Sequence, residues 1–172
     1  MKILALETSA KAVSAALSED GRILASGYQD TGLTHSRTLM PIVEHLFRNT
    51  GLTMSDCDAV AVAAGPGSFT GLRIGSATAK GLGLALNKPL VHVPTVDALA
   101  YNLYGTDRVI CPLMDARRNQ VYTGIYEFRN NELSVIEPQM AVGIEVIAGK
   151  LPRMRISLCC LHAAGIGSHT RT

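Results

Sequence analysis

A row of small residues between positions 67 and 83 limits most strongly how this chain can fold. Glycine or alanine recurs there at every fourth position. Four residues advance a helix by about 400°, so the row stays on one helix face and drifts only about 40° per step. Each glycine inside a helix costs about 1 kcal/mol relative to alanine. We therefore expect close approach of another element, from this chain's own sheet or from a second chain. The row consists of Gly67, Gly71, Gly75, Ala79 and Gly83.

These glycines do not match two common phosphate-binding patterns. The dinucleotide fingerprint G-x-G-x-x-G would need its third glycine one place before Gly71. The P-loop needs a lysine followed by Ser or Thr after its last glycine, where Leu72 and Arg73 stand. Ser68 is a predicted helix N-cap. An anion at this helix N-terminus is the minor alternative to packing.

Hydrophobic periodicity predicts an α/β chain with a mixed sheet. A proline at position 41 requires the first helix to start near residue 36 or 38, or to kink. Helices are predicted at 35–51, 68–86 and 95–103. Strands are predicted at 2–7, in two runs within 12–28 around a turn at 19–21, and at 58–66, 89–93, 108–115, 120–128 and 132–138.

A faint internal repeat relates residues 4–17 to residues 112–125. The alignment matches Glu7 with Asp115, and each acid ends an apolar strand before a polar turn. The repeat suggests two related halves. Across a cleft, the two carboxylates could act as acid and base. We favour the other interpretation, in which Glu7 and Thr8 cap a tight turn through side-chain to backbone bonds.

Composition excludes several classes of protein. The net charge of +2, from 16 Lys/Arg and 14 Asp/Glu, leaves no basic footprint for nucleic acid. No apolar run approaches the roughly 18 residues of a membrane span. The four cysteines form no C-x-x-C pair, which is typical of a reduced cytoplasmic protein.

Four segments together resemble the TsaB (YeaZ-like) family, accessory proteins of tRNA threonylcarbamoyladenosine synthesis. They are "ILALETS", "HSRTLMPIVEHLF", "GPGSFTGLRIGSATAKGLGLAL" and "DARRNQVYTGIY". The resemblance covers roughly residues 1–144. It implies a duplicated actin-like (ASKHA, RNase H-like) fold, with an N-terminal half at 1–104 and a C-terminal half at 105–172. From about residue 145 the tail departs from the family, so we expect an incomplete second half.

The resemblance also implies partners. Family members pair with the transferase TsaD, while the ATPase TsaE completes the assembly, and tRNA is met only through the complex. Homodimers are expected as well. Because the first two helices form the family's pairing surface, the glycine row would lie in an interface, and Gly75→Leu would disrupt association before stability. The other expected interface residues are Leu39, Ile42, Val43 and Leu46.

Catalytic relatives carry a metal-binding His-x-x-x-His pair, and Thr95 and Leu99 stand at the matching places. We therefore expect no catalytic metal and no catalytic residue, and a subunit that is not itself an enzyme. No cofactor is expected, although weak or interface-shared ATP or ADP is an alternative, with its site at Glu7, Thr8, Ser9 and Asp115. The alternative function is an actin-like ATPase or a glycoprotease-like hydrolase.

Overall fold

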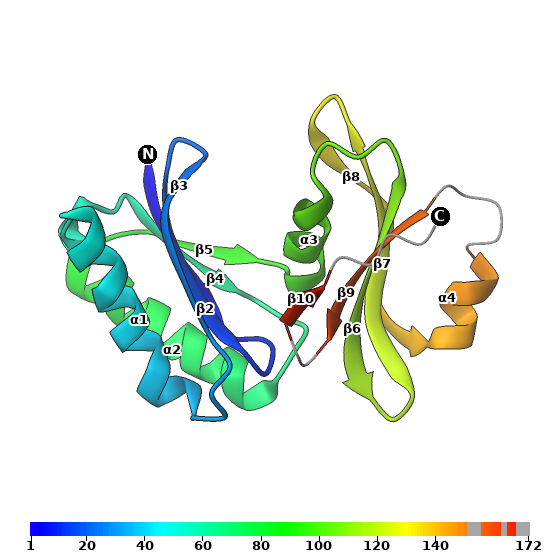
Figure 1. Ribbon diagram of the computed structural model, residues 1–172, viewed down its shortest axis with the longest axis horizontal. Helices are drawn as coiled ribbons and strands as arrows, with labels where there is room; N and C mark the ends of the chain where they lie inside the picture. The colour runs from blue at the N-terminus through cyan, green and yellow to red at the C-terminus, as the bar shows by residue number, and fades with distance from the viewer. Residues whose placement is uncertain (151–155, 163–164, 168–172) are drawn as a thin grey trace. The chain divides into compact units, whose positions relative to one another are not determined.

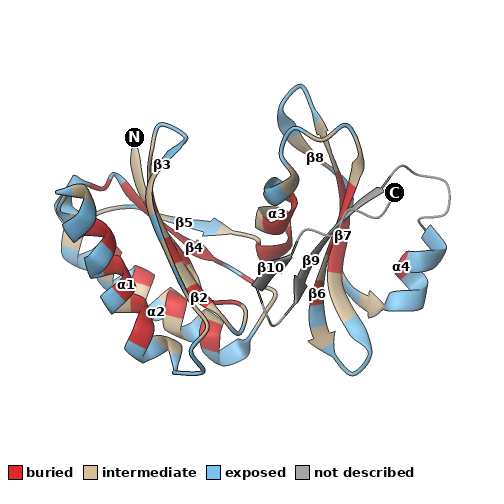
Figure 2. Cartoon of the chain, in the orientation of Figure 1, coloured by how far each residue is buried: buried red, intermediate tan, exposed pale blue. Residues whose placement is uncertain are grey.

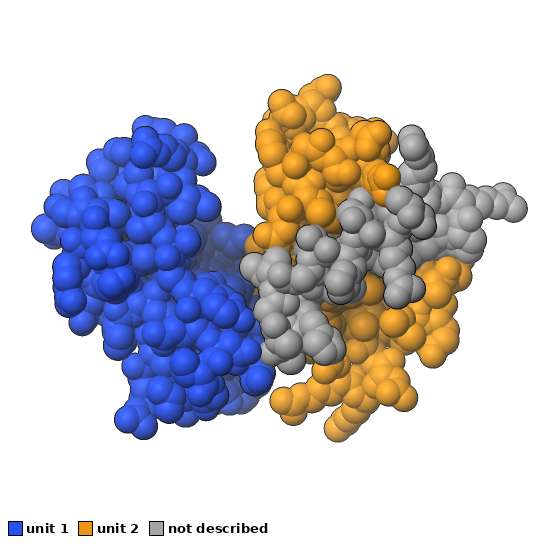
Figure 3. Space-filling view, in the orientation of Figure 1, with its two compact units in different colours: residues 1–94 blue, residues 95–172 orange. Residues whose placement is uncertain are grey.

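The computed structural model describes residues 1–150, 156–162 and 165–167. The chain divides into two compact units, Met1–Pro94 and Thr95–Thr172 (Figure 3). The sequence analysis placed the boundary after residue 104. The structure assigns helix α3, Thr95–Ala100, to the second unit, because Val96 and Ala100 pack with Ile110 and Tyr126 in that unit's core. Within the described residues, no helix combines the length and apolar character needed to cross a membrane.

The first unit is built on a five-stranded sheet in the order β3-β2-β1-β4-β5 (Figure 1). β1, β2 and β3 form an antiparallel meander, whereas β4 runs parallel to β1 and β5 runs parallel to β4. All five strands fall where the apolar runs predicted them. They span Lys2–Glu7 (β1), Val13–Glu19 (β2), Arg22–Gln29 (β3), Ala59–Ala63 (β4) and Leu90–Val93 (β5).

Two helices cover one face of this sheet and bury a shared core. α1 spans His35–Thr50 and follows β3. The short 3-10 helix η1 at Met54–Asp56 then leads from α1 to β4. α2 spans Phe69–Leu86 and connects β4 to β5. In Figure 2 the buried side of α1 faces the sheet. The core is made by Leu4, Leu6, Val13, Ala15, Leu17, Leu39, Ile42, Val43, Leu46, Phe47, Cys57, Val60, Val62 and Ala79.

The ends of α1 and α2 agree with the sequence prediction. Ser68 caps α2, because its Oγ accepts a hydrogen bond of 3.2 Å from the Gly71 amide. Gly51 ends α1 with a left-handed φ of 69°. α1 begins at His35, beside the predicted start near residue 36, and Pro41 lies inside it, so the carbonyl of Arg37 has no N–H donor four residues on.

The second unit repeats the strand order of the first. Its order is β10-β9-β6-β7-β8, so β6 is the central strand. β6 pairs antiparallel with β7 and parallel with β9. In the first sheet, β1 pairs in the same way with β2 and β4. The predicted duplication is thereby confirmed. The strands are Val109–Arg117 (β6), Gln120–Arg129 (β7), Glu132–Gly143 (β8), Ile156–His162 (β9) and Gly165–Gly167 (β10). α3 and the 3-10 helix η2 at Tyr101–Leu103 precede β6, and α4 at Ile144–Lys150 connects β8 to β9.

The expected atypical tail carries regular structure where it is described. α4 follows β8, as α1 follows β3, and β9 then pairs with β6 from Val109 to Met114. The repeat ends at the fifth strand, because β10 pairs antiparallel with β9 whereas β5 is parallel to β4. The remaining tail residues, 151–155, 163–164 and 168–172, lie outside the described part.

Candidate functional site

The two acids of the internal repeat hold equivalent turns. Glu7 ends β1, and its Oε1 accepts a hydrogen bond from the amide of Ser9. Asp115 lies near the end of β6, and its Oδ1 accepts a hydrogen bond of 2.7 Å from the amide of Arg117. Each carboxylate therefore binds the amide two residues ahead. The predicted capping role is confirmed for Glu7, and the structure extends it to Asp115.

The turn after β1 is packed tightly beneath the glycine row. A Cβ added to Gly71 would lie 2.0 Å from the Thr8 carbonyl oxygen, and one added to Gly75 would lie 2.2 Å from Thr8 Oγ1. At Gly67 the nearest atom would be the carbonyl oxygen of Ser9, at 2.5 Å. These distances are far below ordinary contact, so only glycine allows α2 to approach this turn.

The row therefore packs inside its own unit. Gly71, Gly75, Ala79 and Gly83 are buried, and a Cβ on Gly83 would lie 2.7 Å from a side-chain carbon of Leu90. Of the two alternatives raised by the sequence, packing on the chain's own sheet is the one observed. The expectation that Gly75→Leu leaves stability intact fails, because a leucine has no space beside Thr8.

The apolar residues expected in the interface from α1 also belong to the core. Leu39, Ile42, Val43 and Leu46 are between 0% and 5% exposed and lie in the cluster beneath α1 and α2. A side chain that is buried in the folded unit cannot be a surface contact. The helical spacing was correct, but it identifies the face that packs on the sheet.

The turn residues do not fit a nucleotide phosphate within the first unit. Thr8 and Ser9 are 0% and 1% exposed, and their hydroxyls have no hydrogen-bond partner among the described residues. The capping role expected of Thr8 is thus absent. The backbone of α2 fills the space beside Thr8, and the Ser68 amide donates a 2.6 Å hydrogen bond to the Ser9 carbonyl. Both hydroxyls are closed off from a ligand.

The exposed side of α2 carries the cations Arg73 and Lys80 and, toward its C-terminal end, apolar residues that the sequence analysis missed. Leu84 is 87% exposed, and Gly81 and Ala85, three residues before and one after it, are exposed too. These three residues, here called the outer face of α2, lie together because positions three and four apart are neighbours on a helix. A helix that is apolar on opposite sides is typical of one covered on both. The apolar residues at 81–85 were the signal in the sequence from which this exposed face could have been predicted.

The positions matching the metal-binding pair lie in the second unit on α3. Thr95 and Leu99 are 1% and 7% exposed, one turn apart, and face its core. The described residues contain no group of three or more His, Cys, Asp or Glu side chains placed to hold a metal. The same helix carries Asp97, which accepts a 2.8 Å hydrogen bond from the buried hydroxyl of Tyr126. Burial and this bond raise the pKa of Tyr126.

Comparison with solved structures decides the family. YeaZ from Pseudomonas aeruginosa is 35% identical, with a TM-score of 0.74 over 82% of this chain and 67% of that one. The chain belongs to the TsaB/YeaZ family. A second structure, described as an uncharacterized protein with similarity to the peptidase YeaZ from Pseudomonas aeruginosa, has a TM-score of 0.79 at 31% identity, covering 96% and 85% of the two chains. These matches agree with the actin-like fold predicted for a TsaB/YeaZ chain.

Sequence relatives agree with this assignment to TsaB/YeaZ. The TsaB protein of Bacillus subtilis is 37% identical over 142 residues, which is 83% of this chain and 62% of that protein. The TsaB protein of Escherichia coli is 35% identical over 76% of this chain and 57% of that protein. The chain thus spans about three fifths of the length of these relatives. The family model "TsaD: tRNA N6-adenosine threonylcarbamoyltransferase" matches residues 29–157.

Proposed function

We propose that this chain is a non-catalytic partner subunit that supports a TsaD-like transferase in the transfer of threonylcarbamoyl to tRNA adenosine. Two relatives carry the name "tRNA threonylcarbamoyladenosine biosynthesis protein TsaB". A non-catalytic role is supported by Thr95 and Leu99, which stand where the catalytic relatives carry histidines, and by Glu7, whose carboxylate is engaged by the Ser9 amide.

The outer face of α2 is the observation that carries this proposal. A leucine that is 87% exposed beside Gly81 and Ala85 on the helix surface leaves apolar surface in water. Small neighbours let a second helix approach closely, so Leu84 can enter a groove on that helix. We place the pairing with the TsaD-like subunit here, on the side of α2 opposite the glycine row.

The same surface serves self-association when the transferase is absent. A homodimer and a pair with the TsaD-like subunit then compete for one face. A TsaE-like ATPase joins the pair, and tRNA binds through the complex. Any ATP or ADP that the assembly needs is shared at an interface, because the hydroxyls of Thr8 and Ser9 are closed off within this unit.

Size-exclusion chromatography with light scattering tests the pairing. The chain is mixed with the TsaD homologue from its own genome, and wild type is compared with Leu84→Ser. We expect a stable pair for wild type and a loss of affinity of about 10-fold or more for the variant, since a central apolar anchor contributes about 1.4 kcal/mol or more.

Ile23→Ser is the matched control, because Ile23 is an exposed apolar residue, 65% exposed, on β3. It should pair as wild type does. Equal pairing by Leu84→Ser would contradict the assignment of the surface. Steady ATP hydrolysis by the purified chain alone, lost in Glu7→Ala, would contradict the non-catalytic role and favour the ATPase alternative.

A further inference from the structure

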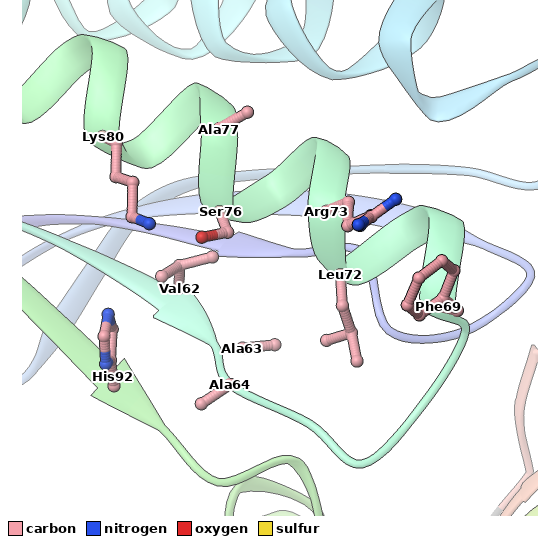
Figure 4. A pocket seen from close by; sticks show the side chains of 10 residues that line it. All are labelled: Val62, Ala63, Ala64, Phe69, Leu72, Arg73, Ser76, Ala77, Lys80 and His92. Carbon is pink, nitrogen blue, oxygen red and sulfur yellow. The ribbon is translucent and has the colours of Figure 1, made fainter.

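An open groove of about 480 Å³ lies beside α2 (Figure 4). It adjoins the outer face, because the lining residues Lys80 and Ala77 lie one helical turn before Leu84 and Gly81. Its floor comes from the ends of β4 and β5, and its wall is α2. Val62 pairs with His92 in the sheet, so both side chains point to the face that carries α2. Val62 is buried beneath the helix, whereas His92 is exposed in the groove. α2 thus leaves part of β5 uncovered.

The groove has basic side chains and no acidic one. Arg73 and Lys80 of α2 and His92 of β5 line it, with Ser76 between the two cations along the helix. In Figure 4, Lys80, Ser76 and His92 extend toward a common space, while Arg73 lies at the other end beside Phe69. Arg73 stacks on the Phe69 ring at 4.4 Å. Neither Arg73 nor Lys80 takes part in an ion pair with a described residue.

The spacing of the two cations matches an extended peptide. Arg73 and Lys80 are seven residues apart, which is about 10 Å along a helix. A peptide in the extended polyproline II conformation rises about 3.1 Å per residue and repeats every three residues, so it covers about the same distance in three residues and presents positions i and i+3 on one side. Apart from Ser76 and the basic side chains, the lining is apolar and includes Leu72, Ala63 and Ala77. This surface accommodates an apolar side chain between two carboxylates.

We propose that this groove binds an extended acidic segment of a partner protein, with two carboxylates three residues apart and an apolar side chain between them. One carboxylate meets Arg73, and the other meets Lys80, Ser76 and His92. The apolar lining favours a peptide over a nucleic-acid backbone, and a net charge of +2 gives the chain no wider basic stripe for phosphates. The proposal uses none of Gly81, Leu84 and Ala85, although Lys80 adjoins Leu84 on the helix, so pairing and peptide binding are measured separately for each variant.

A labelled synthetic peptide containing Glu-Leu-Val-Glu tests the groove by fluorescence anisotropy on the full chain. The matched peptide has glutamine in place of both glutamates. We expect saturable binding of the acidic peptide, weaker at high salt, and at least about 10-fold weaker binding of the glutamine peptide, because charge-assisted hydrogen bonds are lost. Amide shifts at Ser76 and His92 in a heteronuclear NMR titration should locate the contact.

Single-charge variants locate the site independently of the peptide. Lys80→Ala should weaken binding about fivefold or more, whereas Arg22→Ala, which removes an exposed cation on β3, should change it less than twofold. Both residues are exposed, so the variants should fold equally well. The proposal is overturned if no saturable binding occurs, if Lys80→Ala and Arg22→Ala bind alike, or if single-stranded oligouridylate binds in the groove more tightly than the acidic peptide. Pairing of Lys80→Ala with the TsaD homologue is measured as well. If this variant pairs normally, its loss of peptide binding reports on the groove and not on the proposed function.

Discussion

At the scale of single residues, Thr8 explains why the glycines of α2 are needed. Its carbonyl and hydroxyl oxygens lie directly beneath Gly71 and Gly75, and the residue is fully buried. The cost of glycine in a helix is offset here by the approach of α2 to β1. Elsewhere on the same helix a glycine is free of contacts: a Cβ on Gly81 would meet nothing within 4 Å.

This difference predicts opposite effects for the same substitution at two positions. Gly71→Ala should lower the free energy of unfolding by about 1–3 kcal/mol, because the new Cβ overlaps backbone at Thr8 that cannot move aside. Gly81→Ala should raise it by up to about 1 kcal/mol through helix propensity alone. Urea unfolding followed by circular dichroism measures both. Equal shifts in the two variants would show that Thr8 does not restrict α2.

Tyr126 and Asp97 provide a second residue-scale prediction, in the other unit. Tyr126→Phe removes the 2.8 Å hydrogen bond to Asp97 and should lower the free energy of unfolding by about 1–3 kcal/mol near neutral pH. Because the folded-state pKa of Tyr126 is raised above its usual value near 10, its contribution is fully present below pH 10 and is lost as pH rises further.

The alkaline behaviour separates this bond from a packing effect. The difference in stability between wild type and Tyr126→Phe should shrink above about pH 10, as measured by urea unfolding at a series of pH values. A difference that stays constant across that range would assign the loss to packing alone.

At the scale of elements, α1 carries a proline that its core-facing residues compensate. Six buried side chains, from Thr38 to Phe47, pack on the sheet and hold the helix together across Pro41. The proline is exposed, so it adds nothing to that core. Tertiary packing therefore outweighs a local preference against helix at this point.

Replacing this proline should make α1 more stable. Pro41→Ala restores an N–H donor to the carbonyl of Arg37, and we expect the free energy of unfolding to rise by about 1–3 kcal/mol. Thermal unfolding by calorimetry measures the gain. A lower melting temperature would mean that the proline fixes a helix geometry on which the packing of α1 depends.

At the scale of the whole molecule, two units with the same strand order differ in the core formed by residues 1–150, for which burial is described. The first unit has a single cluster that joins both helices to the sheet. Within residues 95–150, the second unit has two small clusters, one around Val96 and Tyr126 and one around Cys111 and Ile147. Apolar burial is the main favourable contribution to folding, so the units should differ in local stability.

Hydrogen exchange on the intact chain should show this difference. Amides of β1 and β4 should exchange at least about 10-fold more slowly than those of β7 and β8, because opening the first unit exposes a larger core. Mass spectrometry of peptides from each unit provides the comparison. Equal protection in the two units would indicate that they unfold together.

The sequence by itself determined the main helices and strands up to β8 and the repeat, but not α4, β9 and β10. Local signals were sufficient for this: short apolar runs gave the strands, a serine at 68 and a glycine at 51 marked helix ends, and Glu7 and Asp115 revealed two equivalent turns. These features depend on neighbours within a few residues, which the chain order already specifies.

Only the tertiary structure decided what each helix face meets. The row from Gly67 to Gly83 and the apolar spacing of α1 are compatible with a sheet or with a second chain, because both demand small or apolar residues at helical intervals. The tertiary structure decided between these two alternatives, because it brings Thr8 beneath α2 and leaves Leu84 in solvent. The groove likewise joins Lys80 of α2 to His92 of β5, whose adjacency follows from the parallel pairing of β4 and β5 and from no local pattern.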